Sequence, residues 1–150
     1  MKAVFYLFVF LVLLADQLTK LLVVRSMTLE QSIPVIESVF HLTYVHNPGG
    51  AFGILAYHTW FFIVVTLVVA VMILFLLRQF QPMSYWLTLA LALQLGGALG
   101  NLVDRIRQSY VIDFLDFRFW PVFNLADTSI VVGIFLLLWQ LVRMPQEKGA

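Results

Sequence analysis

The chain has 150 residues, of which 62% are hydrophobic and 11% are charged, and its formal net charge is +1. Soluble domains contain roughly 45–50% apolar and about 25% charged residues, so this composition excludes a disordered chain and predicts a membrane protein. The near-neutral charge excludes a soluble nucleic-acid binder. The absence of cysteine excludes a disulfide scaffold, a thiol nucleophile and a cysteine metal site.

Four stretches are long and apolar enough to cross a bilayer, which takes roughly 20 residues in a helix. They run at about 3–24, 59–77, 84–103 and 121–142. We therefore expect a single all-α membrane domain over residues 1–150, with four transmembrane helices. The first stretch could be a cleaved signal peptide, but it is longer than a usual signal-peptide apolar region and no small-residue cleavage site follows it. We expect it to remain as a span.

Four spans place both termini on one side of the membrane and two long loops, 25–58 and 104–120, on the other, which we call the far face. In the first loop, residues 39–45 are rich in β-branched and aromatic side chains, which indicates a strand, and the segment NPGG at 47–50 is typical of a turn. We expect a small β element at the membrane surface there, and a short interfacial helix in the second loop. On the other side, the Gln-Pro pair at 81–82 predicts a turn at 78–83. Lysines and arginines divide four to five between the two sides, which does not settle the orientation.

The polar residues of the spans gather in one layer beneath the far face. With a helical rise of about 1.5 Å per residue, Asp16 lies roughly 12 Å deep and Asp127, six residues into the fourth span, roughly 9 Å deep. Asn101 and Asp104 lie at the far end of the third span. Scattered polar residues would not converge in this way, so we interpret the layer as a functional site.

Three motifs have a structural interpretation beside a functional one. Asp16 and Lys20 are four residues apart and can form an ion pair; since a charge at the centre of a span costs about 2.5–3.5 kcal/mol, we expect this pair to orient other groups at the site. The segment NPGGAF is equally compatible with a plain turn and with close approach of its backbone to a substrate. The glycines at 96, 97 and 100 predict helix packing, followed by a polar cluster in which Asp104 has Arg105 at hand.

Five aspartates lie near the far face: Asp16, Asp104, Asp113, Asp116 and Asp127. Two of the five, Asp113 and Asp127, have no cation at helical spacing. Asp113 could be an ordinary loop residue, but an unpaired carboxylate inside a membrane, such as Asp127, is a functional hypothesis by default. Two carboxyl groups that share a site titrate apart, so that one can take a proton from water while the other donates to a carbonyl oxygen, as in aspartic proteases. The zinc-peptidase and serine-hydrolase patterns H-E-x-x-H and G-x-S-x-G are absent.

The chain resembles the lipoprotein signal peptidase (signal peptidase II) family over nearly its whole length. The resemblance rests on five segments in the right order and spacing: DQLTK at 16–20, NPGGAFG at 47–53, GGALGNLVDR at 96–105, VIDF at 111–114 and FNLADT at 123–128. Each segment alone is a weak signal, but the five together make chance agreement improbable.

The resemblance implies a bacterial intramembrane aspartic endopeptidase that removes the signal peptide from prolipoproteins, on the N-terminal side of a diacylglyceryl-modified cysteine. It implies that Asp113 and Asp127 are catalytic, that both termini are cytoplasmic, and that the site lies near the outer face of the inner membrane. We expect a lipid-modified signal peptide and membrane lipid as partners, no nucleic acid, no metal or organic cofactor, and a monomer. Ten further positions are expected to bind substrate or support the site: Asp16, Lys20, Asn47, Gly49, Gly100, Asn101, Asp104, Arg105, Asn124 and Ala126.

Two other classes of function remain as alternatives. One is a proton-coupled transporter or channel in which Asp16 and Asp127 relay protons, although its polar residues should then cross the whole membrane. The other is a non-enzymatic assembly subunit that packs on a partner through the glycine-rich third span. Cleavage of a lipidated precursor distinguishes the peptidase from both.

Overall fold

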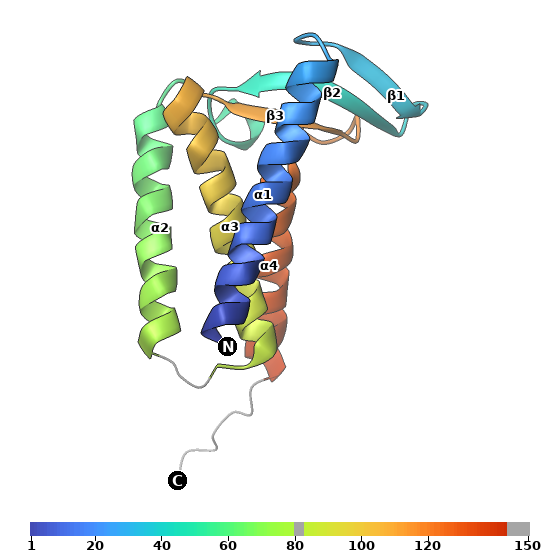
Figure 1. The fold of residues 1–150 in the computed structure, drawn as a ribbon. Coiled ribbons are helices and arrows are strands. Elements are labelled where there is room, and N and C mark those ends of the chain that lie inside the picture. The colour runs from blue at the N-terminus through green and yellow to red at the C-terminus, as the bar shows by residue number, and fades with distance from the viewer. Residues whose placement is uncertain (80–82, 144–150) are drawn as a thin grey trace.

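The computed structural model describes residues 1–79 and 83–143 and contains four long helices, α1 (Lys2–Ser26), α2 (Thr59–Gln79), α3 (Tyr85–Gln108) and α4 (Leu125–Arg143). They form a bundle with their axes along one direction (Figure 1). All four are long and apolar enough to cross a membrane, which confirms the four predicted spans. Residues 80–82 of the expected turn at 78–83 lie outside the described residues.

Two helix ends differ from the prediction. The third helix continues for five residues beyond position 103, to Gln108, so that Asp104 and Arg105 belong to its last turns. The fourth begins at Leu125 rather than near Pro121. Asp127 is therefore in the first turn of α4, nearer the helix end than the six residues we expected.

Small residues on α3 allow the neighbouring helices to approach closely. A Cβ atom at Gly96 would lie 2.8 Å from the side chain of Val12 on α1, and one at Gly97 would overlap the carbonyl oxygen of Ala126 on α4. Both distances are below those of real Cβ contacts, so the predicted packing role of these glycines is confirmed. α3 contacts all three other helices.

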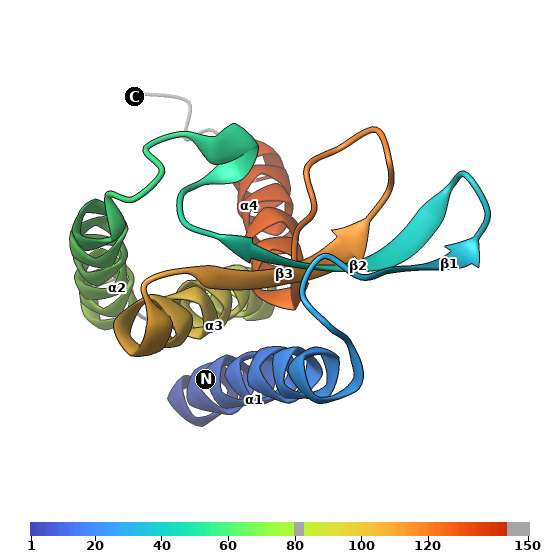
Figure 2. The same cartoon turned by 90° about the horizontal axis from the view of Figure 1, so that it is seen from above.

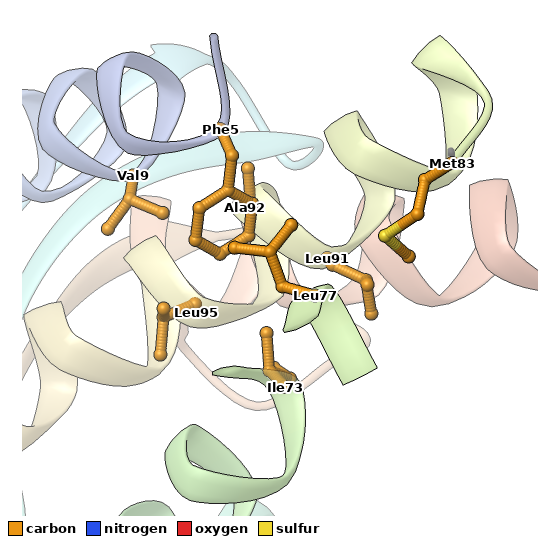
Figure 3. Packing of buried hydrophobic residues seen from close by; sticks show 8 residues of the cluster. All are labelled: Phe5, Val9, Ile73, Leu77, Met83, Leu91, Ala92 and Leu95. Carbon is orange, nitrogen blue, oxygen red and sulfur yellow. The ribbon is translucent and has the colours of Figure 1, made fainter. Parts of the chain in front are cut away.

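The core of the bundle is apolar at the end that holds the N-terminus. There a buried cluster joins α1, α2 and α3 (Figure 3), and its members are Phe5, Val9, Ile73, Leu77, Met83, Leu91, Ala92 and Leu95. Large apolar side chains also remain exposed on the outer faces of the helices, such as Leu22, Val68 and Phe135. Helices that are apolar on all sides suit a lipid environment.

A three-stranded antiparallel sheet, ordered β1 (Ser32–Ile36), β2 (Phe40–Asn47) and β3 (Val111–Asp116), lies across the opposite end of the bundle (Figures 1 and 2). The strand predicted at 39–45 is confirmed as β2. The short helix expected in the second loop is wrong, because residues 111–116 pair with β2 as a strand instead. The described part of the first loop also contains β1 and a short 3-10 helix, η1 (Ala51–Gly53), neither of which we predicted.

The sheet is fixed to the end of α1 by a second buried cluster. Ile112 and Phe114 of β3 and Tyr44 of β2 pack there against Val23 and Met27. Because successive side chains of a strand point to opposite faces, Asp113 between them is turned to the other side of the sheet. The packing of β3 on α1 therefore positions an aspartate.

Candidate active site

The two aspartates selected from the sequence line one cavity of about 260 Å³ at the sheet end of the bundle. Asp113 comes from the middle of β3 and is almost completely buried, and Asp127 comes from the first turn of α4. Among the residues that the structure describes, neither carboxylate forms an ion pair, as their lack of nearby cations in the sequence predicted. Four of the expected supporting residues share the cavity wall: Asn47, Gly49, Asn101 and Arg105.

Asp127 is held by the start of its own helix. The Oδ1 atom of Asn124 accepts the backbone N–H of Asp127 at 2.9 Å, and Asp127 Oδ2 accepts the backbone N–H of Asn124 at 3.3 Å. This reciprocal arrangement is a capping box, which satisfies two N–H groups that a helix start otherwise leaves unpaired. The cap explains why α4 begins after Asn124, and it fixes the orientation of the Asp127 side chain.

The same asparagine also reaches the other aspartate. Asn124 is fully buried, and its Nδ2 atom donates to Asp113 Oδ1 at 2.6 Å and to Asn101 Oδ1 at 3.0 Å. Asn101 in turn donates from Nδ2 to Asp127 Oδ1 at 2.7 Å. Asn124 thus donates to both carboxyl groups, to Asp113 from its side-chain amide and to Asp127 from its backbone N–H, and the amide of Asn101 links α3 to Asp127.

The turn at 47–50 supplies a second donor to Asp113. Asn47 lies beside Val111 in the antiparallel register of β2 and β3, which puts its side chain diagonally opposite Asp113. Its Nδ2 donates to Asp113 Oδ2 at 2.9 Å, and its Oδ1 accepts the N–H of Gly49 at 3.0 Å. The segment therefore forms the expected turn, and its glycine backbone lines the cavity.

Arg105 places a cation in the cavity wall without pairing to Asp104. Its Nη2 donates to the carbonyl oxygen of Gly49 at 3.2 Å, and its guanidinium lies 4.6 Å from the centre of the Phe62 ring. The expected contact between Asp104 and Arg105 is wrong, because consecutive residues of a helix do not face each other. Asp104 turns towards α1 instead.

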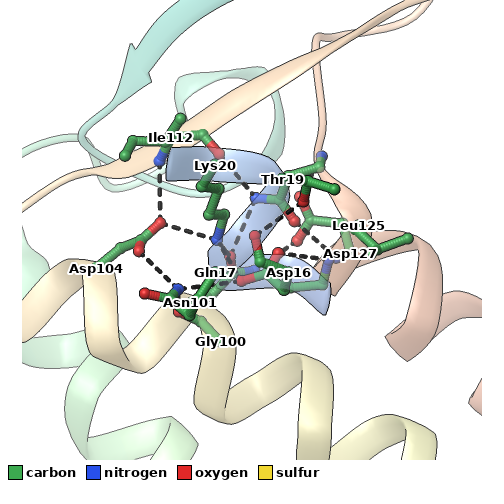
Figure 4. A network of polar contacts seen from close by, with 12 residues as sticks. Asp16, Gln17, Thr19, Lys20, Gly100, Asn101, Asp104, Ile112, Leu125 and Asp127 are labelled. Carbon is green, nitrogen blue, oxygen red and sulfur yellow. Dashed lines mark hydrogen bonds and ion pairs between the residues drawn. The ribbon is translucent and has the colours of Figure 1, made fainter. Parts of the chain in front are cut away.

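A buried charge network beneath the cavity connects α1, α3 and the two elements that carry the aspartates (Figure 4). Lys20 Nζ lies 2.9 Å from Asp16 Oδ2, which confirms the predicted ion pair, and 2.8 Å from Asp104 Oδ2. Asp16 Oδ1 accepts the N–H of Ala126 at 3.0 Å, in the first turn of α4, and Asp104 Oδ2 accepts the N–H of Ile112 at 3.2 Å, next to Asp113. The network therefore anchors both aspartate-bearing elements to the bundle.

Gln17 belongs to this network and was not predicted. Its Nε2 lies within hydrogen-bond distance of Asp16 Oδ2, Asp104 Oδ1 and the carbonyl oxygen of Gly100, at 3.1–3.2 Å. Gly100 itself leaves no room for a side chain, because an added Cβ would overlap Asp16 Oδ2. A glutamine directly after Asp16 within an apolar span was the available signal for it.

Burial gives Asp113 unusual acid–base properties. Loss of solvent, and then the nearby charge of Asp127, raise the pKa of Asp113 to about 7, although the amides of Asn47 and Asn124 act in the opposite direction. Two neighbouring carboxyl groups that hold one proton near neutral pH are the arrangement that aspartic peptidases use. Within the described residues, no group of three or more His, Asp, Glu or Cys side chains is arranged to hold a metal ion.

An apolar groove of about 420 Å³ adjoins the cavity along α4. The two share Trp120, Phe123, Asp127 and Val131, so Asp127 stands between them. The rest of the groove is formed by Phe117, Phe119, Thr128 and Val132. An apolar ligand on the outer surface of α4 can therefore reach the aspartates.

Comparison with known proteins shows the family to which the chain is related. The family model described as signal peptidase (SPase) II matches residues 8–143. The chain belongs to the signal peptidase II family. It is therefore a peptidase, and its four apolar helices make it a multi-pass membrane protein. The family resemblance drawn from the sequence is confirmed.

Individual members of the signal peptidase II family match over nearly the full length. The lipoprotein signal peptidase of Moorella thermoacetica is 54% identical over 145 residues, which cover 97% of each chain. That of Bacillus subtilis is 42% identical over 148 residues, covering 96% of each chain. A solved structure described as a bacterial membrane enzyme superimposes with a TM-score of 0.91 at 28% identity, over 98% of this chain and 92% of that chain.

Proposed function

We propose that this chain is an aspartic endopeptidase that removes the signal peptide from prolipoproteins, cutting on the N-terminal side of a diacylglyceryl-modified cysteine. The observation that carries the proposal is the pair Asp113 and Asp127, which line one cavity and both accept a hydrogen bond from Asn124. The name of the relatives, lipoprotein signal peptidase, supplies the substrate class. The apolar groove beside Asp127 suits a substrate that arrives within the bilayer.

The pair supports hydrolysis by an activated water molecule. One aspartate, as carboxylate, takes a proton from water while the water oxygen attacks the scissile carbonyl carbon, and the other donates its proton to the carbonyl oxygen. The resulting diol collapses as the C–N bond breaks: the first aspartate passes its proton to the leaving nitrogen, and the second recovers one from a diol hydroxyl. The reaction ends with the pair in its starting protonation state.

The distribution of charge in the structure argues against a proton relay. Every buried charged side chain of the described residues lies at the sheet end: Asp16, Lys20, Asp104, Asp113 and Asp116. The core between α1, α2 and α3 at the other end is apolar. A relay for protons needs ionisable groups or water through the whole membrane depth, and this arrangement serves a site at one surface.

We further propose that the sheet end faces the outside of the bacterial inner membrane and that both termini are cytoplasmic. In an exported lipoprotein the modified cysteine becomes the N-terminus, so the peptide bond before this cysteine has to be cut on the outer side of the membrane. We also propose that the chain acts as a monomer, without nucleic acid, metal or organic cofactor.

The test is cleavage of a lipidated prolipoprotein by the purified protein in lipid nanodiscs, with the cut position determined by mass spectrometry. We expect Asp113→Asn and Asp127→Asn each to lower the rate by roughly 10²–10⁴-fold, since each removes an acid or base from the reaction. Glu37→Gln, at an exposed position in the turn between β1 and β2, is the matched control and should retain the rate. Full activity of either aspartate variant, or loss of activity with a chelator and recovery with a metal ion, would overturn the proposal.

A further inference from the structure

Lys20 is a buried cation whose three donors are all in use. Its side chain is 2% exposed, and Nζ contacts Asp16 Oδ2 at 2.9 Å, Asp104 Oδ2 at 2.8 Å and Asn101 Oδ1 at 2.9 Å. An ammonium group has three N–H donors and no acceptor. Lys20 therefore has no donor left for a substrate and does not act as a nucleophile or base in this state.

The contact with Lys20 determines which way the Asn101 amide points. Asn101 Oδ1 receives N–H groups from both Lys20 and Asn124 Nδ2. With the amide turned over, its NH₂ group would face two donors and find no acceptor there. Asn101 Nδ2 must therefore face Asp127 Oδ1, where it donates at 2.7 Å.

The orientation of Asn124 is determined in the same way. Its Oδ1 accepts the backbone N–H of Asp127, so its Nδ2 must point towards Asp113 and Asn101. The Lys20 ammonium and the backbone N–H of Asp127 can only donate. They therefore fix the direction of the hydrogen bonds that the amides of Asn101 and Asn124 make with the two aspartates. Hydrogen bonds arranged in a chain polarise one another, so the charge of Lys20 strengthens the donor that Asn101 presents.

The two aspartates differ in how well they are surrounded for negative charge. Each accepts two N–H groups: Asp113 from Asn47 and Asn124, and Asp127 from Asn101 and the backbone of Asn124. Only Asp127 also lies in the first turn of a helix, where the macrodipole favours an anion. Only its donor Asn101 has a buried cation behind it.

The other cation in the cavity wall adds to this difference, because it interacts more strongly with Asp127 than with Asp113. Arg105 on α3 interacts electrostatically with Asp127 and with Asp113. On the side of the network away from the cavity, Asp16 and Asp104 are both paired with Lys20. The asymmetry between the aspartates therefore comes from the helix start, from Arg105 and from the Lys20–Asn101 link.

We propose that Lys20 is a positioning residue that acts through the Asn101 amide to keep the negative charge of the pair on Asp127, which makes Asp127 the base and Asp113 the acid. This rests on the proposed aspartic mechanism and adds the division of roles to it. It also gives Lys20 a purpose that its ion pairs alone do not explain, because a buried salt bridge adds little net stability.

The test is the pH profile of kcat/KM in Lys20→Gln, Asn101→Leu and the double variant, with the lipidated precursor as substrate. Asn101→Leu removes the donor to Asp127, so we expect the midpoint of the acidic limb to move to higher pH by about one unit. Lys20→Gln should move it in the same direction with little change in KM. In the Asn101→Leu background, Lys20→Gln should cause a much smaller further shift, because only the direct electrostatic interaction between Lys20 and Asp127 then remains.

Arg107→Gln is the matched control, because Arg107 is an exposed cation near the end of α3. The acidic limb of the kcat/KM profile of this variant should stay in place. Thermal unfolding of each variant separates loss of fold from loss of function. An unmoved acidic limb in Asn101→Leu overturns the inference, even if Lys20→Gln fails to fold. Equal shifts from Lys20→Gln with and without Asn101 also overturn it. If cleavage itself does not need both aspartates, the proposed function fails instead.

Discussion

Asn124 is the residue on which the site depends most directly, because it caps α4, orients Asp127 and donates to Asp113. The sequence predicted Asn124 as a supporting residue only through family resemblance. Its spacing of three residues from Asp127 is also the spacing of a capping box, so the start of α4 could have been predicted from the sequence. The absence of a pair between Asp104 and Arg105 could also have been predicted, since residues adjacent on a helix point in different directions.

Some residue contacts could not have been predicted from the sequence. Lys20 and Asp104 are 84 positions apart, and Asp16 meets the backbone of Ala126 across two helices. Local spacing gives no information about such pairs. They arise only when α1, α3 and α4 pack together.

At the scale of single residues, we predict that the titration of Asp113 makes the stability of the folded protein depend on pH. Its pKa in the folded protein is raised to about 7 from an ordinary value of 3.8. Between these values the folded protein holds the proton more tightly than the unfolded chain, so stability falls as pH rises through this range. Asp113→Asn removes the effect. The unfolding temperature of the variant, measured relative to that of the wild type, should therefore rise from pH 5 to pH 8.

Thermal unfolding in detergent measures this difference directly. Glu37→Gln changes an exposed carboxylate and should follow the wild type at both pH values. If wild type and Asp113→Asn lose stability in parallel over the range, Asp113 does not carry a raised pKa.

At the scale of elements, the four helices and β2 were predictable because their signals are local: long apolar stretches, and a run of β-branched and aromatic residues. β3 was not, since a six-residue segment becomes a strand here by pairing with β2 across more than 60 positions of sequence. The outcome matters for the site, because a strand turns Asp113 to the face opposite Ile112 and Phe114.

We predict that Gly97→Ala separates α3 from α4 and destabilises the protein. The added Cβ would overlap the carbonyl oxygen of Ala126 and lie 2.9 Å from the side chain of Ile130. A backbone atom cannot yield as a side chain can, so we expect a loss of about 1–3 kcal/mol in the free energy of unfolding. Cleavage should also slow, because α4 carries Asp127 and α3 carries Asn101.

Gly50→Ala is a suitable control for Gly97→Ala. Its Cβ would meet ring atoms of Phe62 at 3.3 Å, and a side-chain ring can shift. Unfolding measured in the same detergent should show a smaller loss for Gly50→Ala. Equal losses would mean that close packing of α3 on α4 is not what stabilises the site.

For the whole molecule, the main feature is the difference between its two ends. The sheet, the cavity and the buried charges lie at one end, and the N-terminus and an apolar core lie at the other (Figure 1). The basic residues do not determine the orientation of the chain in the membrane, since they are nearly evenly divided between its two sides. The orientation that we propose rests instead on the side of the membrane at which the proposed substrate is cut.

We predict that the sheet end is accessible from outside a bacterial cell. The chain contains no cysteine, so a single introduced cysteine reports one position. Glu37→Cys, between β1 and β2, should react with a membrane-impermeant maleimide in intact spheroplasts. Arg78→Cys, in the last turn of α2 and therefore at the end of the bundle opposite the sheet, should react only after the membrane is permeabilised. The reverse pattern would place the site on the cytoplasmic side.

The central claim is that Asp113 and Asp127 act together on one water molecule. Single-turnover cleavage by Asp113→Asn, Asp127→Asn and the double variant tests it most directly. Groups that act as a unit are strongly non-additive, so each single variant should lose about as much activity as the double variant. Losses that multiply, with the double variant slower than either single variant by the product of their effects, would show that the two aspartates act independently and contradict the account.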